Sequence, residues 1–145
     1  MGHRRIAREC ALQMMYELDV GKHPEEEILR AYWLMKEHPE KVRDFAERLF
    51  RGTVQKLKEI DRVIQRHTKN WRLKRMAAVD RNVLRLAVFE FLWGRETPGT
   101  VVINEALEIA KKFSTFESAQ FVNGILDSIK NDLTEKELRS DGRPD

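Results

Sequence analysis

The stretch AAVDRNVLRLAVFEFLWG, residues 77–94, decides the fold, because it is apolar on nearly every side of a helix. A helix that is apolar all round is buried among other elements, whereas a surface helix has one polar face. Gly94 closes the segment, as glycine commonly does at the C-terminal end of a helix. We therefore expect a central helix that is surrounded by other helices.

Helical periodicity continues on both sides of this segment, and no period-2 strand pattern of useful length interrupts it. Helices are expected over about 3–20, from Pro24 to His38, over 40–67 as one long helix, and in two more segments after Pro98. Gly52 should weaken the long helix by about 1 kcal/mol relative to alanine, unless a neighbouring helix needs the close approach. The sequence predicts an all-α protein, with a single domain over 1–139 and a disordered tail over 140–145.

The composition and motifs exclude several classes of protein. The only cysteine, Cys10, cannot form an internal disulfide or a zinc site with paired cysteines. No apolar run approaches the roughly 18 residues that span a bilayer, and no signal peptide pattern is visible, so a cytoplasmic protein is expected. The sequence has no phosphate-binding loop, no nucleophile elbow and no metal-ligand spacing of histidines. We expect neither an enzyme nor a cofactor or metal.

The distribution of charge is more informative than its sum. Basic residues number 27 and acidic residues 24, so the formal net charge of +3 alone indicates little. The segment 62–75, however, contains six basic residues and no acid. This asymmetry makes a polyanion one candidate partner.

A second cationic cluster lies at the start of the chain, in RRIARECALQMMYELD, residues 4–19. Arg4, Arg5 and Arg8 are neighbours on the helix and are expected to lie off its apolar stripe. Their charges repel one another and oppose the helix dipole, and an anionic ligand would remove both penalties. Guanidinium groups also fit phosphate oxygens in a bidentate geometry. An RNA-binding turn and a solvated helix end both remain open, and the first requires that the protein itself leaves these arginines unneutralised.

Two carboxylates in apolar surroundings also require an explanation. Glu90 lies within the central segment, and Glu105 follows the apolar run TVVI. A charge that is buried without a partner would cost several kcal/mol. Arg81 and Arg85 share a helical face, and Arg85 is a candidate partner for a carboxylate on a crossing helix. A structural polar network is favoured over a direct functional role.

Four blocks together resemble the NusB family of bacterial transcription antitermination factors: residues 4–19 quoted above, WRLKRMAAVDRNVLRLAVFEF, PGTVVINEALEIAKKF and SAQFVNGILD. The resemblance implies an all-helical fold of about seven helices in two small bundles. It also implies a non-catalytic protein that binds boxA RNA together with NusE, a small-subunit ribosomal protein. The pair would join further Nus factors and RNA polymerase to suppress termination, notably in ribosomal RNA operons.

The resemblance also implies roles for individual residues. The expected RNA-binding residues are Arg4, Arg5 and Arg8 in the first helix, and Glu117, Ser118, Gln120 and Phe121 at the start of the last long helix. Phe121 could stack on an unpaired base and Gln120 could read a base edge, although Phe121 could equally be a core residue. The expected partner-binding residues are Tyr16, as an interface anchor, and Asp80, which could instead be only a helix N-cap.

Two alternatives stay open. Some RNA cytosine methyltransferases have a NusB-like domain at their N-terminus, so the chain could be the RNA-binding module of such an enzyme. Because no nucleotide-binding domain follows, this alternative requires a fragment. The other alternative is a purely structural helical oligomer, for instance a homodimer, since some family members self-associate.

Overall fold

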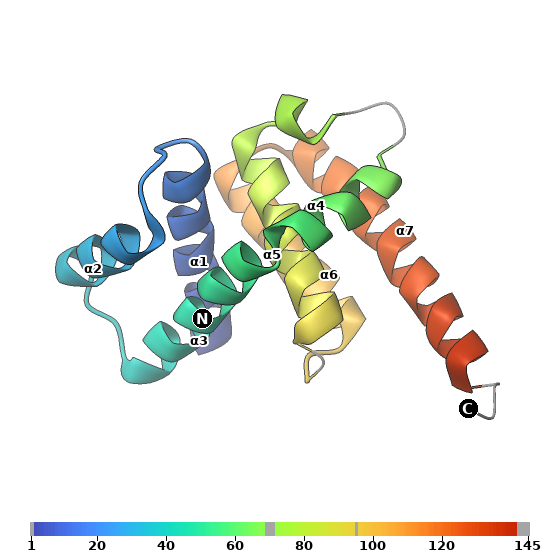
Figure 1. Cartoon of the computed structure of the whole chain (residues 1–145), viewed down its shortest axis with the longest axis horizontal. Helices are drawn as coiled ribbons and strands as arrows, with labels where there is room; N and C mark the ends of the chain where they lie inside the picture. Colours follow the sequence, from blue (N-terminus) through green and yellow to red (C-terminus); the bar gives the residue numbers. More distant parts are fainter. Residues whose placement is uncertain (1, 69–71, 95, 142–145) are drawn as a thin grey trace.

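Seven α-helices and one short 3-10 helix make up the described part of the chain (Figure 1). This computed structural model describes residues 2–68, 72–94 and 96–141, with side chains up to Thr134. In chain order the elements are α1 His3–Asp19, α2 Glu25–Met35, α3 Glu40–Gln55, α4 Leu57–Arg66, η1 Leu73–Arg75, α5 Ala78–Trp93, α6 Gly99–Phe113 and α7 Phe116–Asp141. The prediction of an all-α fold with about seven helices is confirmed.

Helix α5 is the central helix that the sequence predicts. Every residue from Asn82 to Glu90 is buried. Helices α1, α3 and α4, which precede α5 in the chain, and α6 and α7, which follow it, all pack against α5. The two small bundles, α1–α3 and α4–α7, therefore meet at α5, and their buried apolar side chains form a single core cluster.

The single long helix expected over residues 40–67 is wrong, because the structure has two helices there. The chain leaves the helical conformation at Lys56, with φ −102° and ψ 14°, and α4 starts at Leu57. Helix α3 packs on α1 and α5, whereas α4 packs on α5 and α7, so the chain has to turn between them. Apolar residues recur at helical spacing on both sides of Lys56, which is why periodicity alone did not show the break.

Gly52 allows a close approach of a neighbouring helix, which was the expected alternative to a simple weakening of its own helix. A Cβ atom on this residue would overlap the ring of Phe89 in α5. Because only glycine lacks that atom, the site allows α3 to approach α5 closely.

Helix α7 reaches into the tail that the sequence predicts to be disordered. Helix α7 extends to Asp141, so the first two residues of the expected tail 140–145 lie in its last turn. Residues 142–145 lie outside the described residues. In the described ranges, no helix combines the length and the apolar character that a membrane span requires.

Candidate nucleic-acid interface

Arg8 is part of the interior of the protein. Its Nε and Nη2 atoms donate to the two carboxylate oxygens of Glu90 in α5, each at 2.8 Å. Only 5% of Arg8 and 4% of Glu90 is exposed. The prediction that Arg8 lies off the buried face is therefore wrong. A bidentate carboxylate partner makes the burial of this guanidinium tolerable, and the same pair accounts for the charge of Glu90.

Arg5 is also neutralised by the protein. Its Nε donates to Glu105 Oε1 of α6 at 3.0 Å, and Arg8 Nη1 lies 3.6 Å from the same oxygen. The hydrogen bond from Arg5 lowers the pKa of Glu105, and the same hydrogen bond raises the pKa of Arg5. The prediction of an unneutralised cationic turn is thus wrong for both Arg5 and Arg8. The polar network expected around Glu90 and Glu105 exists, with α1 arginines as partners.

Arg4 alone remains exposed in the turn. Its Nη1 donates a long hydrogen bond of 3.4 Å to Thr97 Oγ1, and its guanidinium lies 4.9 Å from the centre of the Phe45 ring. A cleft of about 420 Å³ opens beside it, lined by His3, Arg4, Lys41, Asp44, Phe45 and Arg48. The cations and the aromatic ring of α3 thus extend the surface that starts at Arg4.

Five of these cleft residues were missed as site residues, among them Lys41, Phe45 and Arg48 on α3. Their spacing of four and three residues does place them on one face of a helix. Nothing in the sequence, however, shows that this face lies beside the start of α1. Arg48 also pairs with Glu96 at 2.7 Å, on the exposed surface.

The start of α7 is held by a small hydroxyl network. The backbone N–H of Ser118 donates to Thr115 Oγ1 at 3.0 Å, so Thr115, directly before the helix, is the capping residue. Ser118 Oγ in turn donates to Asp80 Oδ2 at 3.0 Å. Since Ala77 precedes α5 and Asp80 lies in the first turn, the alternative that Asp80 is only an N-cap is wrong.

Asp80 shares a cleft with three of the expected RNA-binding residues. The cleft measures about 270 Å³ and is lined by Arg75, Met76, Ala77, Asp80, Glu117, Ser118 and Phe121. Asp80 is 6% exposed, and its Oδ1 atom has no hydrogen-bond partner among the described residues. Phe121 is half-buried and packs against the core, so part of its ring is structural.

Gln120 lies outside that cleft and is exposed. Phe116, the first residue of α7, is 62% exposed and was not predicted as a site residue. An exposed aromatic ring at a helix start is a possible stacking platform for a base. The sequence did not indicate that Phe116 is exposed, because it lies between the apolar stripes of α6 and α7.

Helix α6 connects the two ends of the surface. Arg5 of α1 pairs with Glu105 of α6. One turn further along α1, Glu9 Oε1 lies 2.8 Å from Nζ of Lys112 in α6. These pairs place α6 alongside α1, and about 12 Å of helix separates Glu105 from Phe113 at 1.5 Å per residue. The α7 start follows directly after α6. Helix α6 therefore lies between the Arg4 end and the α7 end, and we call the surface along α1, α6 and the start of α7, from Arg4 to Gln120, the α1–α7 strip.

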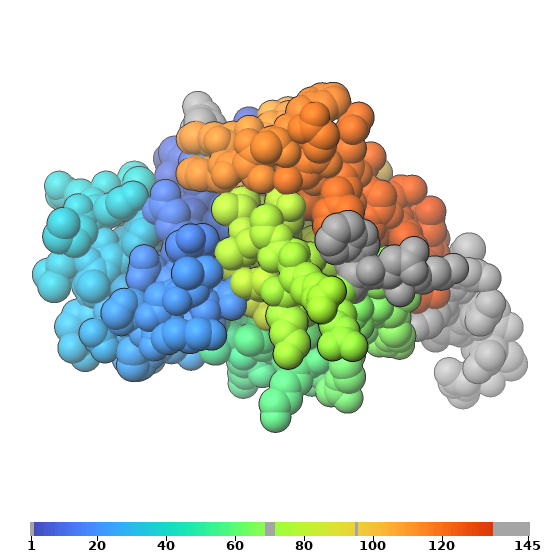
Figure 2. Space-filling model, turned by 90° about the horizontal axis from the view of Figure 1, so that it is seen from above, coloured from blue at the N-terminus to red at the C-terminus, as the bar shows by residue number. Residues whose placement is uncertain are grey.

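Tyr16 lies further along α1. It is 41% exposed, and Val20, one turn later, is 47% exposed. The two side chains form an apolar patch of the kind that protein partners cover. Figure 2 shows the face on which the C-terminal end of α1, in blue, lies beside the segment around residue 80, in lime, and the start of α7, in orange.

The chain matches known proteins along most of its length. A model of the NusB family matches residues 5–131. The chain is 48% identical over 133 residues to the transcription antitermination protein NusB of Koribacter versatilis, covering 91% of each chain. It is 49% identical over 138 residues to that of Solibacter usitatus, covering 93% of each. It is also similar to a chain in a crystal structure of the antitermination factors NusB and NusE in complex with dsRNA, with a TM-score of 0.83, 26% identity, and coverage of 90% of this chain and 98% of that one.

The fold and the strip define an all-helical protein with cationic and aromatic groups on its surface. Among the described residues, no group of three or more His, Cys, Asp or Glu side chains is arranged to hold a metal ion. The chain belongs to the NusB family.

Proposed function

We propose that the protein is a transcription antitermination factor that binds boxA RNA together with NusE and helps RNA polymerase read through terminators, notably in ribosomal RNA operons. It would act in the cytoplasm as a non-catalytic adaptor. Relatives named as NusB proteins and a similar structure that contains NusB, NusE and RNA support this function. Because those relatives match over about nine-tenths of their own length, the alternative of a methyltransferase module is not favoured. The observation on which the proposal depends is the α1–α7 strip, with an exposed arginine at its Arg4 end and exposed polar and aromatic side chains at its α7 end.

The Arg4 end of the strip is proposed to hold the phosphate backbone. Arg4 and Arg48 present guanidinium groups at the cleft beside α3, and Phe45 lies between them. Phosphate contacts position an RNA and give a salt-dependent affinity. Arg5 contributes from its exposed edge, since 35% of its side chain is accessible. Arg8 does not contact RNA in this proposal, because it holds α1 against α5 from the interior.

The α7 end of the strip is proposed to contact bases. Gln120 and Glu117 are exposed and can form hydrogen bonds with base edges, and Phe116 can stack on an unpaired base. Phe121 offers the accessible part of its ring from the cleft. Ser118 has a positioning role, because its hydroxyl is engaged with Asp80.

The partner surface is proposed to lie beside the strip. Tyr16 and Val20 offer an apolar patch, and Asp80 Oδ1 is a buried acceptor without a donor among the described residues. A buried acceptor that lacks a hydrogen bond costs about 1–3 kcal/mol. A donor from NusE that enters the cleft would satisfy it.

An RNA titration tests the proposal. Fluorescence anisotropy is measured with boxA RNA and with a scrambled sequence, each with and without NusE. We expect weak, salt-dependent binding by the protein alone, and tighter, boxA-selective binding with NusE. Equal affinity for both RNAs in the presence of NusE would contradict the proposed function.

A matched pair of variants then tests the strip itself. The variant Arg4→Ala with Arg48→Ala should lower the affinity at least tenfold and reduce the salt slope by about 0.7 for each lost contact to single-stranded RNA. The control is Arg30→Ala with Lys58→Ala, which removes two exposed cations outside the strip. Equal losses in both variants would assign the effect to net charge and remove the Arg4 end from the RNA site.

A further inference from the structure

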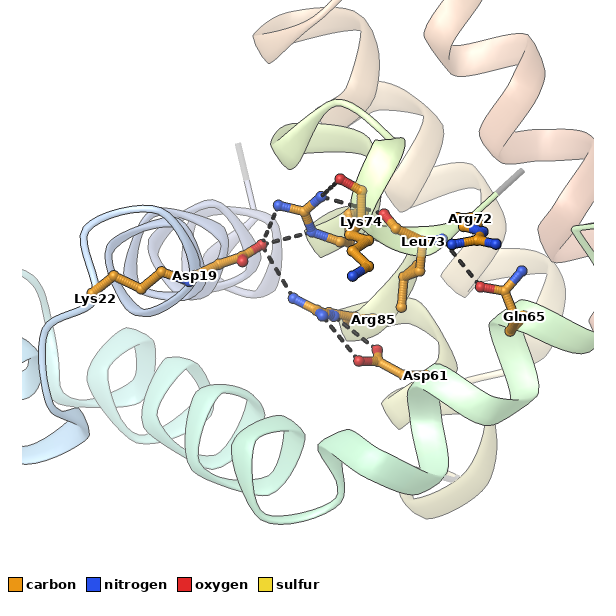
Figure 3. A pocket seen from close by; sticks show the side chains of 9 residues that line it. Asp19, Lys22, Asp61, Gln65, Arg72, Leu73, Lys74 and Arg85 are labelled. Carbon is orange, nitrogen blue, oxygen red and sulfur yellow. Dashed lines mark hydrogen bonds and ion pairs between the residues drawn. The ribbon is translucent and has the colours of Figure 1, made fainter.

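The basic segment 62–75 has no role in the proposed interface, although the sequence singles it out. In the structure its described part runs from α4 through η1 to the start of α5. It borders the largest described cleft, about 770 Å³, which also includes the C-terminal end of α1 (Figure 3). That volume lies within the usual range for small-molecule sites.

The floor of this cleft is made of two arginines that are held in place. Arg85 is 8% exposed, and its Nε and Nη2 atoms donate to both oxygens of Asp61, each at 2.9 Å. Arg81 Nε donates to Asp19 Oδ2 at 2.7 Å, and its Nη1 donates to the carbonyl of Met76 at 3.0 Å. Arg85 Nη1 reaches the same Asp19 oxygen at 3.2 Å, so the floor is one connected network.

The carboxylate of Asp19 in the floor remains charged at neutral pH. Burial alone would raise the pKa of Asp19, but hydrogen bonds from Arg81 and Asn82 and the charge of Arg85 bring it below its usual value. The floor is thus close to neutral: two cations against two anions. Both oxygens of Asp61 and Oδ2 of Asp19 already accept hydrogen bonds from these arginines.

The rim of the cleft is not neutral. It contributes Lys22, Arg72 and Lys74, and no carboxylate among the described residues pairs with any of them. In Figure 3, Lys74 extends toward Arg85, Arg72 lies on the other side of Leu73 beside Gln65, and Lys22 extends away from the cleft. The whole cleft therefore has five cationic side chains against two carboxylates.

This excess charge decides the sign of the ligand. Like charges that gather around a partly enclosed cleft repel one another and raise the local concentration of anions. A metal cation would meet the same repulsion. Among biological anions, phosphate oxygens suit a lysine point charge and an arginine fork together. Two separate rim cations, Arg72 and Lys74, which flank Leu73, favour a ligand with more than one phosphate.

We propose that this cleft is a second anion site, which binds linked phosphate groups between Arg72 and Lys74 above the Arg81–Arg85 floor. The phosphates could belong to a free oligophosphate or to an RNA backbone. The site is distinct from the α1–α7 strip, since its cleft shares no lining residue with either of the two clefts of the strip.

Calorimetric titration of the full chain with pyrophosphate tests the site directly. We expect one-to-one binding by the wild type. The variant Arg72→Gln with Lys74→Gln should weaken it at least tenfold. The matched control, Arg30→Gln with Lys58→Gln, removes the same charge from exposed positions outside this cleft and outside the strip, and it should stay within twofold of the wild type. Circular dichroism confirms that all three proteins are folded.

A second titration identifies the source of the phosphates. The same three proteins are titrated with a fluorescent single-stranded RNA that lacks boxA. If Arg72→Gln with Lys74→Gln weakens only pyrophosphate binding, the ligand is a free oligophosphate; if it weakens RNA binding at least tenfold, the RNA backbone occupies the site. Equal weakening by the two double variants in either titration, or no weakening by Arg72→Gln with Lys74→Gln in both, would overturn the proposal. The boxA selectivity of the proposed function is measured separately, so the two hypotheses can fail independently.

Discussion

Two cationic segments of similar density have opposite electrostatic roles in this protein. In α1, Arg5 and Arg8 are neutralised by carboxylates of α6 and α5. In the segment after α4, Arg72 and Lys74 remain unpaired by any described carboxylate. The arginines of α1, whose local repulsion gave the stronger argument for a ligand, are therefore mostly paired inside the protein.

The difference arises from long-range pairing. Arg8 pairs with a residue 82 positions away, and Arg5 with one 100 positions away. No local rule about repulsion or helix dipoles includes such partners. A cluster of basic residues in a sequence therefore does not by itself identify a ligand site. The fold determines which of the charges are paired internally and which are available to a ligand.

The largest expected effect separates a structural arginine from a free one. Arg8→Ala should lower the free energy of unfolding by about 3–5 kcal/mol, because Glu90 would be left buried without a partner. Urea unfolding followed by circular dichroism measures it. The double variant Arg8→Met with Glu90→Leu should recover most of the loss, since no charge is then left unpaired. A loss below 1 kcal/mol for Arg8→Ala would show that the pair is not buried in solution.

The floor of the second anion site should show the next largest effect. Arg85→Ala removes hydrogen bonds to Asp61 and Asp19 and should cost about 1.5–3 kcal/mol. The cost is smaller than for Arg8 because 28% of the Asp61 side chain is accessible to water. Thermal unfolding measures the loss. A Tm equal to that of the wild type would mean that the floor is not held by this network.

Arg5 should have a small effect that depends on pH. Arg5→Ala should cost about 1 kcal/mol or less at pH 7, because the pair is partly exposed. Since the pKa of Glu105 is lowered in the folded state, its contribution is present above the unfolded value of about 4.3 and is lost as the pH falls below it. Urea unfolding at pH 7 and pH 3.5 should therefore show a smaller drop for Glu105→Gln than for the wild type. Equal drops would remove this pair from the acid sensitivity.

The free cations should have the smallest effect on stability. Arg72→Gln with Lys74→Gln, and Arg4→Ala, should each change the free energy of unfolding by no more than about 0.5 kcal/mol, as expected for exposed side chains outside the core. The same urea experiment measures both. A loss above 1.5 kcal/mol in either variant would show that the replaced cations stabilise the fold, and would contradict the contrast between the two segments.

Most of the fold could be predicted from the sequence, because helical periodicity and breakers are local. The buried stretch 77–94 predicted the central helix, and the Gly52 alternative of a close approach is what the Phe89 contact shows. The break at Lys56 could not be predicted, since no Pro or Gly marks it and apolar spacing continues across it. It results from the different helices on which α3 and α4 pack.

The site was less predictable, because it depends on which faces meet. Tyr16 and Gln120 are exposed as an interface requires. Arg8 is buried against a helix far along the chain, and Asp80 is buried below Ser118. Phe45 and Arg48 have the right spacing to share a face, but only the packing of α3 on α1 places that face beside Arg4.

The pairing of Arg8 with Glu90 also constrains how the protein can evolve. Either side chain can be replaced safely only when its counterpart, in a distant part of the gene, changes as well. A codon change that removes the charge at one of the two positions leaves the other charge isolated in the interior, so the path to an apolar pair passes through a destabilised intermediate. The two positions should consequently change together in evolution, although both side chains are buried and neither is visible at the surface.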